Sequence, residues 1–152
     1  MKNILLTVVV AIVGFGAILY VAYKRNIKMQ HNKIVDQYNS MVNHCDALNN
    51  SVNELLKTQE TEQKNSFDNQ CTMANFECNE IIKLYEPKRM HMAQNPQEMM
   101  LLDFAYIFQQ QIEAMQEYFK LPEEKKLEQL EKITAFENQK DNLAKQITKS
   151  TK

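Results

Sequence analysis

Glycine is confined to one short part of this chain of 152 residues. Its two glycines, Gly14 and Gly16, lie inside an apolar run, and residues 24–152 contain none. Tight hairpin turns, strand bulges and phosphate-binding loops depend on backbone angles that glycine adopts more easily than other residues. The distribution therefore argues against a β-rich fold and against a nucleotide-binding loop, and it predicts an all-α protein.

The apolar run extends from Ile4 to Tyr23 and contains no charged side chain. A bilayer core of about 30 Å is spanned by a helix of about 20 apolar residues, which is the length of this run. Cleavage by signal peptidase needs small residues at positions −3 and −1, and the end of the run does not offer that pair. We therefore predict that residues 1–23 are an uncleaved signal anchor with a single transmembrane helix.

The run is followed by a cluster of basic residues without an acid among them: Lys24, Arg25, Lys28 and Lys33. Positive flanks favour the cytoplasmic side, so we expect a bacterial-type inner-membrane protein whose bulk domain faces the cytoplasm. A short Met-Lys start is also compatible with an anchor that exports its C-terminal part. The cluster either orients the span or contacts anionic lipid headgroups.

After the run, apolar residues recur mostly at intervals of four and three, which is typical of helix faces. The predicted apolar stripe of the second helix is Phe67, Cys71, Ala74, Cys78, Ile81 and Tyr85. That of the third is Leu101, Ala105, Phe108, Ile112, Met115 and Phe119, and that of the fourth is Leu127, Leu130, Ile133, Phe136, Leu143 and Ile147. Ser66 is a suitable N-cap, and Asn95-Pro96 is a typical helix start. We predict four helices, at 24–63, 66–86, 97–120 and 122–147, with a linker at 87–96. The expected fold is a transmembrane helix that continues into the first long helix, which packs with the other three as an antiparallel bundle over residues 24–149.

The first helix is predicted to be about 60 Å long beyond the membrane, about twice the length of the second or third. Part of it would then lie outside the bundle. We expect an exposed apolar stripe there, as in a coiled coil, that serves self-association or binds another membrane protein. The predicted interaction surface consists of Ile27, Ile34, Tyr38 and Met41.

Three cysteines lie on the predicted apolar faces, where free thiols behave as small hydrophobic groups. Cys45, Cys71 and Cys78 are an odd number and do not indicate a disulfide framework. The motif Met90-His91-Met92 combines two thioethers with an imidazole, which can bind Cu(I). A methionine-rich loop also suits a partner surface, so this motif is a weak metal candidate.

Other classes of function have no sequence signal here. The 18 basic and 19 acidic residues give a net charge of −1 and form no basic stripe for nucleic acid. No serine has a glycine-flanked nucleophile motif, and no carboxylate pair marks a pocket. We therefore expect no catalytic residues, no cofactor and no small-molecule substrate.

The arrangement of a short anchor, a long helix and a helical bundle resembles the LemA family of bacterial membrane proteins. Residues 46–52 (DALNNSV) align with that family's Asp-Leu-Ile-Pro-Asn-Leu-Val stretch through Asp46, Asn50 and Val52. Residues 62–67 (EQKNSF) resemble the His-Glu-Lys-x-Thr-Phe-like stretch that follows it. The family's Tyr-Pro-x-Leu…Phe segment has its counterparts in Pro96 and Phe104.

The resemblance covers residues 30–112 and implies a membrane-anchored bundle with a scaffold, tether or protein-interaction role. An alternative is a periplasm-facing helical stalk similar to the inner-membrane spanins of phage lysis, which also begin with an anchor. A third possibility is a copper-binding module built on the Met-His-Met motif.

Overall fold

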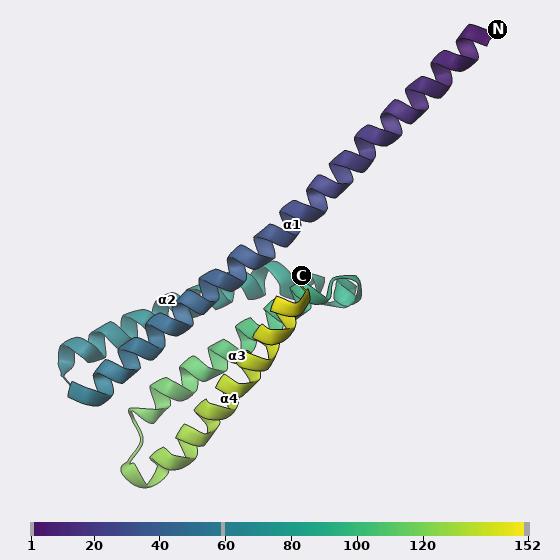
Figure 1. Ribbon diagram of the computed structural model, residues 1–152. Helices are drawn as coiled ribbons and strands as arrows, with labels where there is room; N and C mark the ends of the chain where they lie inside the picture. The colour runs from purple at the N-terminus through teal and green to yellow at the C-terminus, as the bar shows by residue number, and fades with distance from the viewer. Residues whose placement is uncertain (1, 59, 151–152) are drawn as a thin grey trace. The chain divides into compact units, whose positions relative to one another are not determined.

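The computed structural model describes residues 2–58 and 60–150, and it places the side chains of residues 20–58, 60–91 and 95–147. The regular structure of these residues is entirely helical, which confirms the all-α prediction. The elements are α1 (Lys2–Thr58), α2 (Thr61–Tyr85), the 3-10 helix η1 (Glu86–Gln94), α3 (Pro96–Tyr118) and α4 (Glu123–Ser150), as Figure 1 shows. The chain divides into two compact units, Met1–Asp36 and Gln37–Lys152.

Within Gln37–Lys152 the helices that follow each other along the chain run antiparallel (Figure 1). The end of α2 meets the start of this unit's share of α1, where Tyr85 Oη donates to Gln37 Oε1 at 2.7 Å. The end of α3 meets the first half of α4, where Gln129 Nε2 donates to the Ala114 carbonyl oxygen at 3.0 Å. Short connections between helices favour such antiparallel neighbours.

Helix α3 lies at the centre of this unit, because it has side-chain contacts with each of the other three α-helices. The Phe104 ring meets the Tyr38 ring of α1 edge-on, with centroids 5.6 Å apart. Gln109 Nε2 donates to Asn79 Oδ1 of α2 at 3.1 Å. Nine residues of α3 are buried, which is more than the number of buried residues on any neighbouring helix. They are Leu101, Leu102, Phe104, Ala105, Phe108, Gln111, Ile112, Ala114 and Met115.

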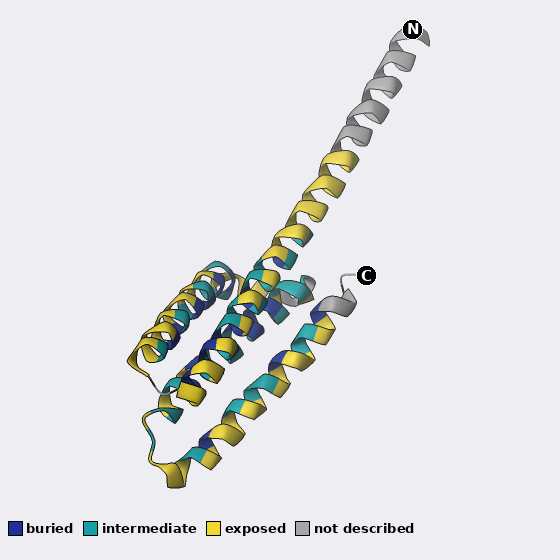
Figure 2. Cartoon of the chain, turned by 60° about the vertical axis from the view of Figure 1, so that its left-hand side comes forward, coloured by how far each residue is buried: buried dark blue, intermediate teal, exposed yellow. Residues whose placement is uncertain are grey.

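The buried faces of α2 and α3 follow the predicted spacing. All six predicted stripe residues of α2 are buried: Phe67, Cys71, Ala74, Cys78, Ile81 and Tyr85. On α3 the predicted stripe is buried up to Met115, and Phe119 is half-buried just beyond the helix. The burial pattern of Figure 2 follows these faces along the helices. Their apolar spacing alone therefore identified the core sides of both helices.

Helix α4 turns a different face inward from the one its leucines suggest. Leu127 is 69% exposed and Leu130 is also exposed, although both belong to the predicted stripe. The residues that face inward are spaced 4, 3, 4, 3 and 4, and two of them are polar: Gln129, Ile133, Phe136, Lys140, Leu143 and Ile147. The prediction is wrong for Leu127 and Leu130, because a regular helix keeps one face inward and Phe136, Leu143 and Ile147 fix that face.

The helix boundaries differ from the prediction at the first connection. The first helix ends at Thr58 instead of residue 63, and α2 begins at Thr61 with Glu60 as its N-cap. Ser66 therefore lies inside α2 and does not cap it. Neither glycine nor proline marks this connection, so its position has no local sequence signal. At the start of α3, Pro96 occupies the first turn as predicted, while the Asn95 side chain forms no capping hydrogen bond.

Residues 87–96, predicted as a linker, are largely helical in the structure. They form most of η1, a 3-10 helix that begins directly at Glu86. Proline at the second position of this segment lacks an N–H donor but fits the first turn of a helix. The segment therefore holds a defined backbone between α2 and α3.

No helix is long and apolar enough to cross a membrane among the residues whose side chains are placed. The predicted span, residues 4–23, lies mostly outside that part of the chain, since side-chain placement begins at Tyr20. The membrane anchor therefore stays a prediction from the sequence.

A pair of leucine truncations tests which leucines form the core. Leu48 is fully buried on α1, and Leu127 is largely exposed on α4. We expect Leu48→Ala to lower the free energy of unfolding by about 3 kcal/mol, because it removes buried methyl groups and leaves a cavity. Leu127→Ala should change it by less than about 0.5 kcal/mol. Urea unfolding followed by circular dichroism measures both, and equal losses would contradict the observed orientation of α4.

Candidate functional site

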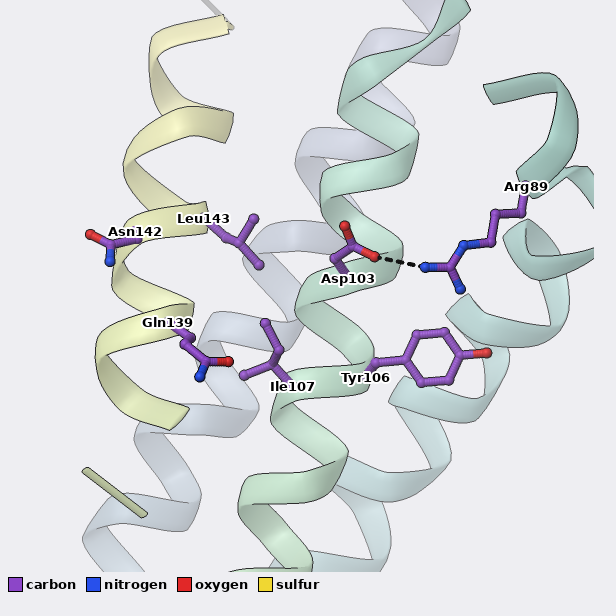
Figure 3. Close-up of a pocket in the computed structure, with 7 residues that line it drawn as sticks. All are labelled: Arg89, Asp103, Tyr106, Ile107, Gln139, Asn142 and Leu143. Atoms are coloured by element: carbon purple, nitrogen blue, oxygen red, sulfur yellow. Dashed lines mark hydrogen bonds and ion pairs between the residues drawn. The ribbon is translucent and has the colours of Figure 1, made fainter. Parts of the chain in front are cut away.

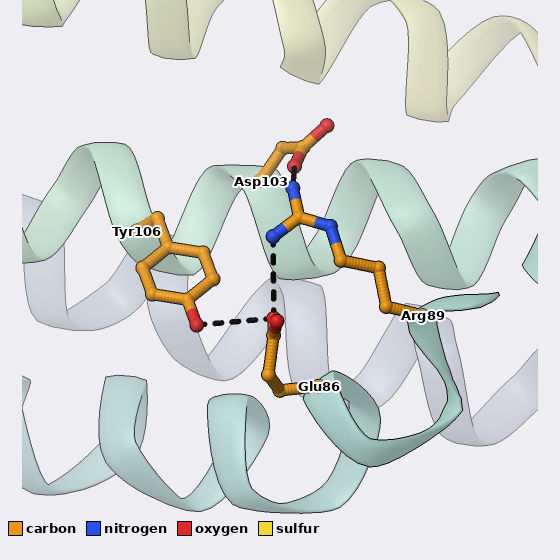
Figure 4. Close-up of polar contacts among 4 residues, drawn as sticks. All are labelled: Glu86, Arg89, Asp103 and Tyr106. Atoms are coloured by element: carbon orange, nitrogen blue, oxygen red, sulfur yellow. Dashed lines mark hydrogen bonds and ion pairs between the residues drawn. The ribbon is translucent and has the colours of Figure 1, made fainter.

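Four polar residues join η1 to α3 in a hydrogen-bonded network, which we name the Arg89 network: Glu86, Arg89, Asp103 and Tyr106. Arg89 Nη1 lies 3.3 Å from Glu86 Oε2, and Arg89 Nη2 lies 3.3 Å from Asp103 Oδ1. Tyr106 Oη donates to the same Glu86 oxygen at 3.0 Å. Figure 4 shows the guanidinium between the two carboxylates. The planar fork of arginine suits such a bridge, because it presents several fixed donors.

The Arg89 network fixes the position of η1 more than it stabilises the fold. Its charged side chains are between 40% and 48% exposed, and ion pairs with that exposure contribute about 0–1 kcal/mol each. Partial burial raises the pKa of Tyr106, and its hydrogen bond to Glu86 raises it further. The phenol therefore stays protonated and remains a donor at neutral pH.

An open groove of about 510 Å³ lies between α3 and α4, beside the Arg89 network. We name it the α3–α4 groove, and it is lined by Arg89, Asp103, Tyr106, Ile107, Gln139, Asn142 and Leu143. Each helix contributes residues at positions i, i+3 and i+4, which share one helix face. In Figure 3, Ile107 and Leu143 point toward each other across the space between the two helices.

The lining of the α3–α4 groove is chemically mixed. Ile107 and Leu143 form its apolar part, and the amides of Gln139 and Asn142 border it from α4 without a hydrogen-bond partner among the described residues. The single positive charge, Arg89, is already neutralised by two carboxylates. The groove therefore offers no free charge for a phosphate or carboxylate ligand, and it suits the amphipathic surface of a protein helix.

A second cavity, of about 370 Å³, lies at the opposite end of the bundle. It is bordered by the end of α1, the start of α2, the end of α3 and the start of α4. Three lysines and three acids line it together with Leu55, Phe67 and Phe119. The charges balance, so this cavity selects neither an anion nor a cation.

A charged residue is buried in the core, in what we name the Lys140 cluster: Cys45, Phe108, Gln111, Glu137 and Lys140. The Lys140 side chain is 4% exposed. Its Nζ lies 2.9 Å from Glu137 Oε2, 3.4 Å from Cys45 Sγ and 4.9 Å from the centroid of the Phe108 ring. Gln111 Nε2 donates to the same carboxylate oxygen at 2.5 Å. The ammonium is therefore held by one counter-charge, one thiol and one aromatic face.

The Lys140 cluster shifts the titration of two of its members. Burial raises the pKa of the Cys45 thiol to about 11, although the nearby Lys140 charge lowers it in part. Burial alone would raise the pKa of Glu137, but hydrogen bonds from Gln111 and Lys140 and the Lys140 charge lower it on balance. At neutral pH the thiol is protonated and the carboxylate is ionised.

The four residues of the predicted interaction surface have different environments. Ile27 is 48% exposed, whereas Ile34 is buried. Tyr38 is half-buried against Phe104, and Met41 is completely buried. Of the four side chains, only that of Ile27 is largely accessible.

The residues of the predicted copper motif lie on η1. Met90 is 94% exposed and His91 is exposed, while the Met92 side chain lies outside the described residues. Within the described part of the chain, no group of three or more His, Cys, Asp or Glu side chains could hold a metal ion. The three cysteines are free and buried, as the apolar spacing predicted.

Comparisons with protein-family models, with curated proteins and with solved structures give no match to this chain. The resemblance to the LemA family thus stays a prediction that rests on the residues quoted for it.

The Arg89 network and the Lys140 cluster were not expected from the sequence. One local signal existed for the first: Glu86 and Arg89 have the i, i+3 spacing of a helical ion pair. A signal also existed for the second, because Lys140 falls on the 4-3 spacing between Phe136 and Ile147. Neither signal identifies the partners from other helices, which are 14 and 95 residues distant in the chain.

A double-mutant cycle tests whether Glu137 compensates the buried charge of Lys140. Glu137→Gln leaves the ammonium without a counter-charge, so we expect the free energy of unfolding to fall by about 2 kcal/mol. Lys140→Met replaces it with an apolar chain of similar length and should change stability by less than about 1 kcal/mol. The double variant should recover most of the loss in urea unfolding, and additive effects would contradict the pairing.

The Glu137 carboxylate should also contribute to the loss of stability at acid pH. Because its pKa is lower in the folded state, its stabilising contribution is complete above the ordinary glutamate pKa of about 4.3 and is lost as the pH falls through the folded value. Glu137→Gln should remove this part of the acid dependence. The comparison uses the unfolding midpoint in urea, measured as a function of pH.

Proposed function

We propose that this chain is a membrane-anchored helical-bundle protein with a non-catalytic scaffold, tether or protein-interaction role, similar in arrangement to the LemA family. The observation that carries the proposal is the α3–α4 groove, an amphipathic surface on a packed helical unit. A partner helix laid along it would cover Ile107 and Leu143 and would meet the amides of Gln139 and Asn142.

The anchor part of the proposal is supported by the sequence from Ile4 to Tyr23 and by the basic residues after it. These features are typical of a single-pass protein of a bacterial-type inner membrane. The cytoplasmic side is favoured for the bundle by the positive flank.

The non-catalytic part is supported by the state of the nucleophiles. Burial raises the pKa of Cys71 and of Cys78 to about 12, and that of Cys45 to about 11. A protonated, buried thiol is a poor nucleophile and a poor metal ligand. The accessible polar residues of the α3–α4 groove are amides and mutually paired charges, which serve recognition better than proton transfer.

A partner for the groove is either a second copy of this chain or another membrane protein. A helix is the preferred occupant, because the groove follows the axes of α3 and α4 over one helical turn on each. The competing surface is the exposed pair Met73 and Phe76 on the outer side of α2. This pair is apolar, and neither residue lines the α3–α4 groove or the cavity at the opposite end of the bundle.

The spanin-like alternative is supported less well, because residues 37–152 form a packed helical unit and not a single stalk. A topology reporter fused to Lys152 separates the two, since the spanin-like protein needs a periplasmic bundle. The buried cysteines are unsuitable for that labelling. The copper alternative predicts that purified protein retains copper and that replacement of Met90 and His91 releases it.

Membrane fractionation tests the anchor. The full-length chain should stay with the membrane pellet after an alkaline carbonate wash, because an apolar helix of this length stays in the bilayer. Deletion of residues 2–23 should move the chain to the supernatant. Release of the full-length chain by the carbonate wash would contradict the proposal.

Sedimentation of the detergent-solubilised full-length chain tests the groove. We expect a mass above that of the monomer, alone or with a co-purified partner, and Ile107→Asp with Leu143→Asp should reduce it to the monomer by placing charges on the apolar part. The matched control, Met73→Asp with Phe76→Asp, should leave the larger mass unchanged. Dissociation by the control pair alone would place the interaction on α2 instead, and circular dichroism verifies that both variants keep their helices.

A further inference from the structure

One segment of α1, residues 20–33, combines exposed apolar side chains with a high density of positive charge. Five apolar or aromatic side chains are between 48% and 65% exposed: Tyr20, Val21, Tyr23, Ile27 and Met29. Figure 2 shows the exposure of this stretch along the helix. The four basic residues, Lys24, Arg25, Lys28 and Lys33, are also exposed, and residues 20–35 include no Asp or Glu.

The basic residues lie within one half of the helix circumference and along a short part of its axis. At about 100° per residue, Lys24, Lys28, Arg25 and Lys33 point in four successive directions. At 1.5 Å per residue, Lys24 and Lys28 are about 6 Å apart along the axis, and Lys33 is about 14 Å from Lys24. A headgroup layer on one side of a bilayer is about 5–8 Å thick, so Lys24, Arg25 and Lys28 fit within one layer.

The aromatic residues precede the basic ones in the order that a membrane interface requires. Tyr20 and Tyr23 come at the end of the apolar run, and tyrosine is enriched where hydrocarbon meets headgroups. Lys24 Nζ lies 5.1 Å from the centroid of the Tyr20 ring, which links the first cation to this aromatic level. Lys33 lies beyond the layer but within a Debye length of about 8–10 Å of it.

We propose that residues 20–33 bind the headgroups of anionic phospholipids, with Lys24, Arg25 and Lys28 in direct contact and Lys33 acting through the surrounding solvent. The proposal rests on the membrane anchor of the proposed function and names the lipid class at its boundary. A basic residue near an anionic surface strengthens attachment by about fivefold, so the three direct contacts distinguish anionic from neutral lipid strongly.

Energy transfer from a single tryptophan tests the lipid preference. The chain contains no Trp, so Ile27→Trp at this exposed position introduces one fluorophore in the middle of the segment. The full-length variant is reconstituted into phosphatidylcholine vesicles that contain phosphatidylglycerol and a trace of dansyl-labelled lipid. The dansyl group is carried either by phosphatidylglycerol or by phosphatidylcholine at equal density.

We expect stronger transfer to labelled phosphatidylglycerol than to labelled phosphatidylcholine, and we expect this excess to decrease with added salt. Lys24→Gln, Arg25→Gln and Lys28→Gln together should remove most of the excess, while Lys33→Gln alone should reduce it only slightly. The matched control replaces three exposed lysines of the bundle, Lys64, Lys120 and Lys125, by Gln, and it should retain the excess.

Equal transfer to the two labelled lipids would overturn the lipid proposal and would leave the anchor intact, since the protein still floats with the vesicles. Failure to float with vesicles of either composition would instead contradict the proposed function. Loss of the excess in the control variant would show that total charge, and not this segment, attracts the anionic lipid. Each result therefore identifies which of the two proposals fails.

Discussion

The apolar face of α3 is the feature on which the rest of the bundle depends. It is wide enough to receive α1, α2 and α4 at the same time, whereas each of those helices buries a narrower stripe. Burial of apolar area is the main favourable term in folding, so the helix with the widest buried face decides where the others lie. The edge-on rings of Tyr38 and Phe104 and the hydrogen bond from Gln109 to Asn79 are local consequences of that arrangement.

The orientation of α4 determines both a set of contacts in the core and a groove on the surface. Because Phe136 and Ile147 turn inward, Lys140 between them must also face the core, where Glu137, Cys45 and Phe108 receive it. Gln139 and Asn142, next to this inward face, then come to border the α3–α4 groove. One choice of helix face thus produces an ion pair whose ammonium is buried and an amphipathic external groove, and it leaves Leu127 exposed.

The positive charges of the bundle and those of residues 20–33 have different surroundings. In the bundle, Arg89 and Lys140 have carboxylate partners within hydrogen-bonding distance. In residues 20–33 the cations are exposed, and Lys24, Arg25 and Lys28 have no acid within four residues in the sequence. Paired charges fix geometry, whereas unpaired ones remain available to an external anion. This difference separates the surface that we propose for protein partners from the one that we propose for lipid.

The sequence by itself determined the all-α class, the apolar run and the buried faces of α2 and α3, because each of these follows from composition or from a repeat within one helix. It did not determine the end of α1 at Thr58 and the start of α2 at Thr61, because no glycine or proline marks them. It also did not determine the helical form of η1, because its proline suggested a linker. The tertiary structure alone decided which residues of other helices meet Arg89 and Lys140, namely Asp103 for the first and Cys45 and Phe108 for the second. Those contacts join residues far apart in the chain, and a periodic pattern describes which face a helix buries but not which side chain it meets there.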